Sequence, residues 1–180
     1  MRTYTHSHRV WDPLVRLFHW SLVLCMGLNW FYLEEGDPPH EWAGYVACAW
    51  VAVRFVWGFV GPHHARFTSF WPSSKRLRAH MGHMWAKPSG ADVQAQLGHN
   101  PLGALMMLAL MALVLSLGVT GWLQTTDWFW GDDEMAELHE WLSNATMALV
   151  GLHVLAALIM SKLQGINLPR AMVTGKKEWN

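Results

Sequence analysis

The stretch that decides the fold is ELHEWLSNATMALVGLHVLAALIM, residues 137–160. It has the apolar character of a buried helix, yet it carries two histidines, His139 and His153. Fourteen helical residues turn through almost four whole turns, so both imidazoles lie on one face, about 21 Å apart along the axis. That distance is most of the roughly 30 Å hydrocarbon core of a bilayer. Because polar side chains at such depths are costly and usually functional, the stretch predicts a spanning helix with one imidazole near each membrane face.

The other apolar residues of the 180-residue chain gather in similar runs. Four runs lie at about 14–33, 42–60, 101–123 and 141–160. Each is near the length that a helix needs to cross a bilayer. The alternative is a soluble bundle of very apolar helices, but the first, third and fourth runs contain no charge after Arg16, which favours a membrane. We therefore predict an all-α integral membrane protein, a bundle of four transmembrane helices that forms a single domain over residues 1–180.

The first run is too long for a cleaved signal peptide, and no small-residue cleavage site precedes the acidic loop, so we expect a retained span. Basic residues predict the orientation. All Lys and Arg except Arg54 fall at the N-terminus, in the loop 61–100 and in the C-terminal tail. The loops 34–41 and 124–140 hold most of the acids and no Lys or Arg. The positive-inside rule then places both termini and the loop 61–100 in the cytoplasm.

Two more histidines match the first two in depth. His19 lies about a turn past Arg16 in the inner part of the first run, and His40 lies at the outer start of the second. We therefore expect His19 to pair with His153 near the inner face, and His40 to pair with His139 near the outer face. Two imidazoles fill both axial positions of a haem iron, so the pairs predict two haems, one above the other.

Other interpretations of these histidines remain open. A single intramembrane histidine is often a hydrogen-bonded packing residue, although four that match in pairs by depth make this less favourable. A zinc site is a weaker rival, because tetrahedral ligation needs ligands that converge on one point. The two cysteines, Cys25 and Cys48, lie inside the first two runs, and no Cys-x-x-Cys-His occurs. Covalent c-type haem attachment is therefore excluded, and the expected cofactor is two haem b.

Arg54 is the one cation inside the second run, fourteen residues after His40. This spacing repeats that of the two histidines in the fourth run, so Arg54 shares the ligand face of its helix at the depth of the inner haem. We expect an ion pair with an inner-haem propionate, whose carboxylate suits a guanidinium. The alternative is that the side chain extends to the inner surface, about 10 Å away by helical rise.

Three further residues are candidates for the same region. Arg16 and Arg66 are additional cations for a haem propionate. His99 precedes the third run at its inner start, where it would hydrogen-bond a propionate or a quinone. A surface role in the capping region is an equal alternative for His99.

Several segments carry a family resemblance. They are VWDPLVRLFHW (10–20), HEWAGYVACAWVAVRFVWGFVGPHHARF (40–67), GHNPLGALMM (98–107), LHEWLSNATMALVGLHV (138–154) and RAMVTGKK (170–177). Together they resemble the bacterial family of di-haem cytochrome b561 and Ni/Fe-hydrogenase b-type cytochrome subunits, over essentially the whole chain. The resemblance implies a four-helix core with two b haems in a bacterial inner membrane. It also implies His19, His40, His139 and His153 as the haem ligands, the assignment reached from depth.

Two six-coordinate haems leave no open iron, which favours electron transfer over catalysis at iron. The resemblance implies electron exchange between the membrane quinone pool and a redox protein. The acidic outer loops favour a partner with a basic docking face, such as a periplasmic c-type cytochrome or another redox subunit. Hydrogenase subunits of the family usually continue past the fourth helix, whereas this chain ends soon after it, so we expect a compact, free-standing quinone-linked cytochrome.

Two other functions stay open at this point. One is direct oxidation or reduction of a small oxidant, superoxide or ferric ion, at the outer haem. The other is a haem-free membrane scaffold or ion carrier. Membrane lipid is an expected partner, a nucleic acid is not, and a homodimer is left open. Whether the protein acts as an enzyme or only as an electron carrier is also undecided.

Overall fold

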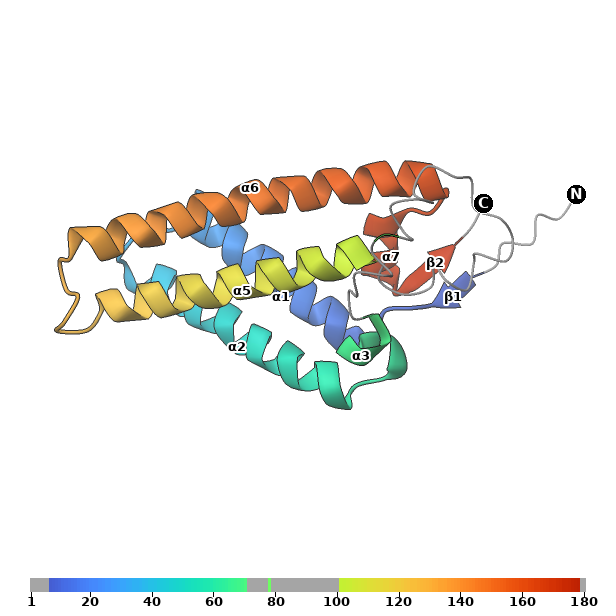
Figure 1. Cartoon of the computed structure of the whole chain (residues 1–180), viewed down its shortest axis with the longest axis horizontal. Coiled ribbons are helices and arrows are strands. Elements are labelled where there is room, and N and C mark those ends of the chain that lie inside the picture. Colours follow the sequence, from blue (N-terminus) through green and yellow to red (C-terminus); the bar gives the residue numbers. More distant parts are fainter. Residues whose placement is uncertain (1–6, 71–77, 79–100, 179–180) are drawn as a thin grey trace, which may run out of the picture. The chain divides into compact units, whose positions relative to one another are not determined.

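A computed structural model describes residues 7–70, 78 and 101–178 (Figure 1). Its four long helices are α1 (Pro13–Phe31), α2 (Pro38–Val60), α5 (Pro101–Gln124) and α6 (Asp133–Gln164). All four are long and apolar enough to cross a membrane. The fold is therefore an all-α membrane bundle, and the fold class predicted from the apolar runs is confirmed.

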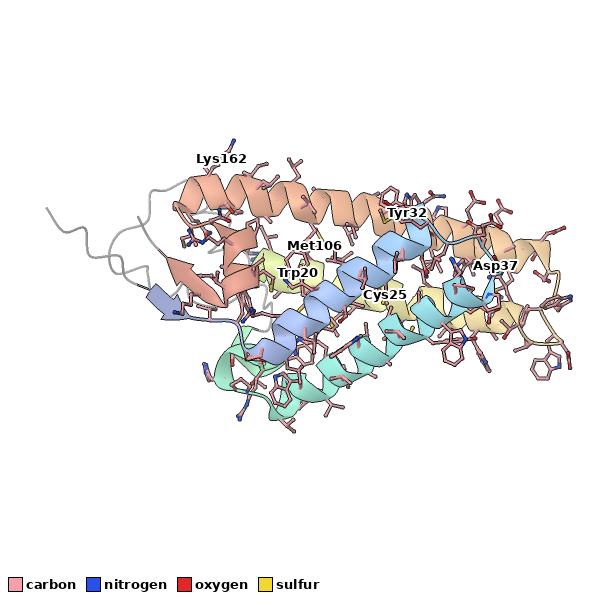
Figure 2. The ribbon with its side chains drawn as sticks, turned by 180° about the vertical axis from the view of Figure 1, so that it is seen from behind. Trp20, Cys25, Tyr32, Asp37, Met106 and Lys162 are labelled. Carbon is pink, nitrogen blue, oxygen red and sulfur yellow. The ribbon has the colours of Figure 1, made fainter. Side chains whose placement is uncertain are left out.

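The remaining elements are short. They are β1 (Ser7–Arg9), the 3₁₀ turn η1 (His63–Ala65), α3 (Phe67–Phe70), α7 (Leu168–Thr174) and β2 (Lys176–Glu178). The expected loop 61–100 thus begins with η1 and α3, and the rest of it, apart from residue 78, lies outside the described residues. Figure 2 shows Tyr32 and Asp37 in the connection between α1 and α2, and Lys162 near the end of α6.

The long helices expose large apolar side chains along their length. No more than 22% of the most apolar window of any of the four helices is buried within the protein. Side chains such as Leu24, Phe55 and Leu155 are more than half exposed. Surfaces of this kind are a liability in water and are normal against lipid tails. The exposure pattern therefore agrees with the hydropathy pattern.

α6 is longer than its apolar run, starting at Asp133 instead of about residue 141 and ending at Gln164 instead of about residue 160. Asp132 caps the start, because its Oδ1 accepts a hydrogen bond from the Met135 amide at 2.8 Å. Acidic residues in the first turn also interact favourably with the helix dipole. A helix of 32 residues is about 48 Å long, so it extends beyond a hydrocarbon core of roughly 30 Å.

The same difference applies at the start of α2, which begins at Pro38 instead of about residue 42. Hydropathy recognises only the apolar part of a spanning helix, whereas caps and backbone hydrogen bonds decide where the helix begins. As a consequence His40 lies in the first turn of α2, and His139 lies in the second turn of α6.

The contacts divide the chain into two compact units, each of which receives residues from all four long helices. The terminal unit comprises Met1–Arg16, Val56–Met107 and Leu152–Asn180. The hairpin unit comprises Leu17–Phe55 and Leu108–Gly151.

In the terminal unit, the two ends of the described chain are joined. β1 and β2 pair antiparallel, with Ser7 opposite Glu178 and Arg9 opposite Lys176 (Figure 1). The carbonyl of Gly175 accepts hydrogen bonds from the amides of Val10 and Trp11. Gly175 ends α7 with a φ of 81°, a left-handed conformation that favours glycine.

The same unit holds a small apolar core. It consists of the buried residues Val10, Trp11, Val15, Ala65 and Ala171. Two side-chain hydrogen bonds hold the start of α1 in this unit. Trp57 Nε1 donates to Asp12 Oδ2 at 3.3 Å, and Arg16 Nη2 donates to the carbonyl of Val173.

In the hairpin unit, α2 and α5 approach closely at Gly118. A Cβ built on Gly118 would lie 2.1 Å from Cys48 Sγ, so only glycine fits there without a shift. Cys48 Sγ also lies 3.7 Å from the carbonyl oxygen of Val114 on α5. Cys25 and Cys48 are both free thiols. On the neighbouring helix pair, Asn29 Nδ2 of α1 donates to the His40 carbonyl of α2 at 3.3 Å.

Candidate functional site

His40 and His139 form a pair of facing imidazoles in the hairpin unit. Their ring centroids are 6.4 Å apart, and the ring planes are inclined by 59°. Both side chains are half-buried. The structure thus brings together the two histidines that the sequence pairs by their depth at the outer membrane face.

The separation of the rings suits one metal ion between them. A metal that binds an imidazole nitrogen on each of two opposite sides, at about 2 Å, places the ring centroids about 6 Å apart. The Nδ1 atom of His40 is buried, and among the described residues it has no hydrogen-bond partner. The main alternative for an intramembrane histidine is a packing role with a hydrogen bond to its ring. The Nδ1 atom of His40 makes no such hydrogen bond with the described residues. The donor set and its geometry fit a haem iron with two axial imidazoles.

His139 is held more firmly than His40. Its Nδ1 lies 2.8 Å from the hydroxyl oxygen of Thr120 on α5. Gly121, the next residue, leaves space for the ring, since a Cβ there would lie 3.3 Å from His139 Cε1. Thr120 is a site residue that sequence reasoning missed. One feature of the sequence could have indicated it. Thr120 is a hydroxyl residue near the end of the apolar run 101–123, at about the depth expected for His139.

His19 and His153 are both half-buried. The His19 ring lies edge-on to Trp20, with the centroids 5.2 Å apart and an interplanar angle of 86°. His19 belongs to the hairpin unit and His153 to the terminal unit. Their pairing stays a prediction from sequence.

Arg54 lies in the hairpin unit and has an exposed fraction of 0%. Full burial does not fit the alternative in which this side chain extends to the membrane surface. Charged side chains are rarely buried completely unless a partner compensates the charge. Arg54 therefore stays a candidate for a buried anion, and a haem propionate is an anion of the required kind.

The three remaining candidates differ in their surroundings. Arg16 fastens α1 to α7 through the carbonyl of Val173, a structural contact in the terminal unit. Arg66 Nε donates to the Gly61 carbonyl at 2.7 Å, just past the end of α2. His99 lies outside the described residues. A tetrahedral zinc site needs several converging ligands, and in the described part of the chain no group of three or more His, Cys, Asp or Glu side chains is placed to hold a metal.

Four spanning helices and a facing imidazole pair between two of them define a multi-pass membrane protein with a two-histidine site. The chain belongs to the prokaryotic cytochrome b561 family, whose model matches residues 10–175. This confirms the resemblance identified from the sequence segments. Members of the family are b-type cytochromes, so the cofactor class is haem b and the activity is electron transfer in a membrane.

Curated relatives extend over most of the chain. The probable Ni/Fe-hydrogenase 1 B-type cytochrome subunit of Escherichia coli (strain K12) is 22% identical over 199 residues, covering 89% of this chain and 84% of the relative. The probable Ni/Fe-hydrogenase B-type cytochrome subunit of Azotobacter vinelandii is 25% identical over 164 residues, covering 74% and 65%. No solved structure matches the chain.

Proposed function

We propose that the protein carries electrons across the membrane through two b haems, between the quinone pool and a redox partner protein. The observation that carries this proposal is the imidazole pair of His40 and His139, with centroids 6.4 Å apart. These two histidines are the axial ligands of one haem, near the outer face. His19 and His153 are the ligands of the second haem, an assignment that rests on their matching depth in the sequence.

The proposed ligation determines the type of chemistry. When bound, each haem would supply a one-electron carrier, and two histidine ligands would leave its iron closed to a substrate. The protein then holds and tunes the group and does not place a substrate on it. Direct reaction of superoxide or ferric ion at the haem edge remains the alternative within redox chemistry, and no described contact favours it.

Arg54 is proposed to bind a propionate of the inner haem. Its guanidinium is completely buried, and it lies fourteen residues after His40 on the same helix. A planar guanidinium binds a carboxylate through two parallel hydrogen bonds, which suits a buried and oriented anion. Arg16 is a secondary candidate for the same propionates, and His99 is a candidate for a propionate or for a quinone.

The proposed orientation places both termini in the cytoplasm and the α1–α2 and α5–α6 connections outside, with the protein in the inner membrane of a bacterium. These two connections and the adjoining helix starts carry the acidic residues Glu34, Glu35, Asp37, Glu41, Asp127, Asp132, Asp133, Glu134, Glu137 and Glu140. The single-sign charge favours a partner with a basic face, such as a periplasmic c-type cytochrome. The names of the relatives favour a hydrogenase as the second candidate partner.

The test is a haem count combined with a reduction experiment. The protein purified in detergent is assayed for haem as the pyridine haemochrome and then mixed in a stopped flow with a short-chain quinol. We expect two b haems per chain, both reduced by the quinol, and electrons passed on to an added basic c-type cytochrome with a rate that falls as salt is added. One haem or none per chain would overturn the two-haem proposal. Two haems that the quinol leaves oxidised would overturn the quinone link alone.

A further inference from the structure

Thr120 connects α5 to His139 by a hydroxyl that has three polar neighbours. Its Oγ1 lies 2.8 Å from His139 Nδ1, 2.9 Å from the Ser116 carbonyl oxygen and 3.2 Å from the Leu117 carbonyl oxygen. The side chain is buried, with 7% of its surface exposed. A buried hydroxyl with three partners at these distances has a defined direction for its single hydrogen.

The direction follows from what each neighbour is able to do. A carbonyl oxygen only accepts, so the Thr120 hydroxyl donates its hydrogen back to the carbonyls of its own helix, as helical threonines commonly do. The hydroxyl lone pairs then face His139. With the hydroxyl hydrogen on a backbone carbonyl, Nδ1 of His139 would carry the ring hydrogen and donate it to Thr120 Oγ1. In a neutral imidazole this leaves Nε2 without a hydrogen and with its lone pair free.

We propose that Thr120 is a positioning residue that holds His139 in this tautomer and presents Nε2 to the haem iron. The inference rests on the proposed function, because it takes His139 as a haem ligand. Histidine ligands usually donate their second ring nitrogen to an acceptor that sets both the tautomer and the ring orientation. Here a threonine hydroxyl on a neighbouring helix is that acceptor.

The two ligands of the pair are held unequally. His139 has its hydrogen bond to Thr120 and an edge that lies against the backbone at Gly121. The Nδ1 atom of His40 has no such partner among the described residues. Thr120 therefore acts on the His139 side alone. A hydrogen bond accepted from Nδ1–H makes an imidazole a stronger electron donor, which stabilises ferric iron and lowers the reduction potential.

The experiment uses the haem-loaded full chain with three variants. Thr120→Val keeps the shape and removes the hydroxyl, and Thr120→Ser restores it. Ser116→Ala is the matched control, because the Ser116 hydroxyl donates to the Ala112 carbonyl at 3.0 Å, one turn earlier on the same helix. The readouts are the midpoint potential of each haem, the low-spin electron paramagnetic resonance signals and the rate of haem transfer to a soluble apoprotein acceptor.

In Thr120→Val, we expect the potential of the His40–His139 haem to rise, its resonance signal to shift and its transfer to accelerate about tenfold or more. The other haem keeps its potential. Thr120→Ser and Ser116→Ala should behave as the wild type. If Thr120→Val loses this haem and Thr120→Ser retains it, the result also supports a positioning role for the Thr120 hydroxyl.

Contrary results distinguish a failure of the role of Thr120 from a failure of the proposed function. Wild-type behaviour of Thr120→Val would overturn the role of Thr120, and so would an equal effect of Ser116→Ala or haem loss in Thr120→Ser. In each of these cases, loss of one haem in His139→Ala would leave the proposed function intact. Retention of both haems in His139→Ala would overturn the proposed function together with this inference.

Discussion

The imidazole rings of His40 and His139 face each other with their centroids 6.4 Å apart, although the first turn of α2 and the second turn of α6 are far apart in sequence. The sequence pairs these two histidines only by their expected depth in the membrane. Single substitutions of each histidine test whether both residues bind the same haem iron.

Removal of a ligand should remove one haem and leave the other. His40→Ala or His139→Ala should each yield a protein with one b haem, because an iron that loses an axial imidazole is bound weakly. His19→Ala or His153→Ala should remove the other haem. The measurement is the haem count with the redox titration of the remaining haem. If His40→Ala and His139→Ala left haems with different potentials, these two residues would not ligate the same iron.

Haem should be extracted completely by acid acetone. The sequence has no Cys-x-x-Cys-His, so no thioether bond anchors the group. Cys25 and Cys48 are free, and their substitution by Ala should leave extraction unchanged. The measurement is the absorbance of the acetone phase against that of the pellet. Haem that stayed in the pellet would contradict non-covalent binding.

Arg54→Leu should retain both haems and lower the potential of the inner one. A nearby cation favours the state with one more electron, and in a low-dielectric site this interaction is poorly screened. The control is Arg66→Leu, because Arg66 is exposed and donates to the Gly61 carbonyl. A redox titration should show a clear shift for Arg54→Leu and little change for the control. An equal shift of both haems would argue against a propionate partner.

Gly118→Ala should destabilise the protein through Cys48. The new methyl would lie 2.1 Å from Cys48 Sγ, and overpacking of this kind costs about 1–3 kcal/mol. The double variant with Cys48→Ala should recover most of the loss, since the conflict involves one atom. Gly44→Ala is the control, because a Cβ there meets nothing within 4 Å. Thermal unfolding in detergent measures these proteins together with the wild type and the single Cys48→Ala variant, and additive losses of the two single variants would contradict the contact.

Lys177 should make stability depend on pH. Burial lowers the pKa of this lysine from 10.5 to about 8. Between these values the unfolded chain binds the proton and the folded chain does not, so stability rises with pH across the window, by about 3 kcal/mol in total. Below pH 8 both states are protonated and the burial penalty is present in full. Lys177→Met should abolish the rise, whereas exposed Lys176→Met should keep it in unfolding curves recorded from pH 7 to 10.5.

The four spans could be predicted from the sequence because hydropathy over about twenty residues is a local property. The starts of α2 and α6 could not, although the end of α2 at Val60 and the start of α5 at Pro101 agree with the predicted runs. The polar first turns of α2 and α6 have little hydropathy signal, and α6 begins at Asp133 because Asp132 caps it. Capping depends on single side chains and backbone geometry, which a window average does not record.

The sequence by itself determined the fold class and the family, and helical pitch converts the spacing of His139 and His153 into positions on one face of a helix. It also predicted His40 as the partner of His139. Only the tertiary structure placed the two rings 6.4 Å apart, buried Arg54 completely and brought the Thr120 hydroxyl to His139. Those facts depend on how helices rotate and pack against one another, and packing is decided by contacts between residues far apart in the chain.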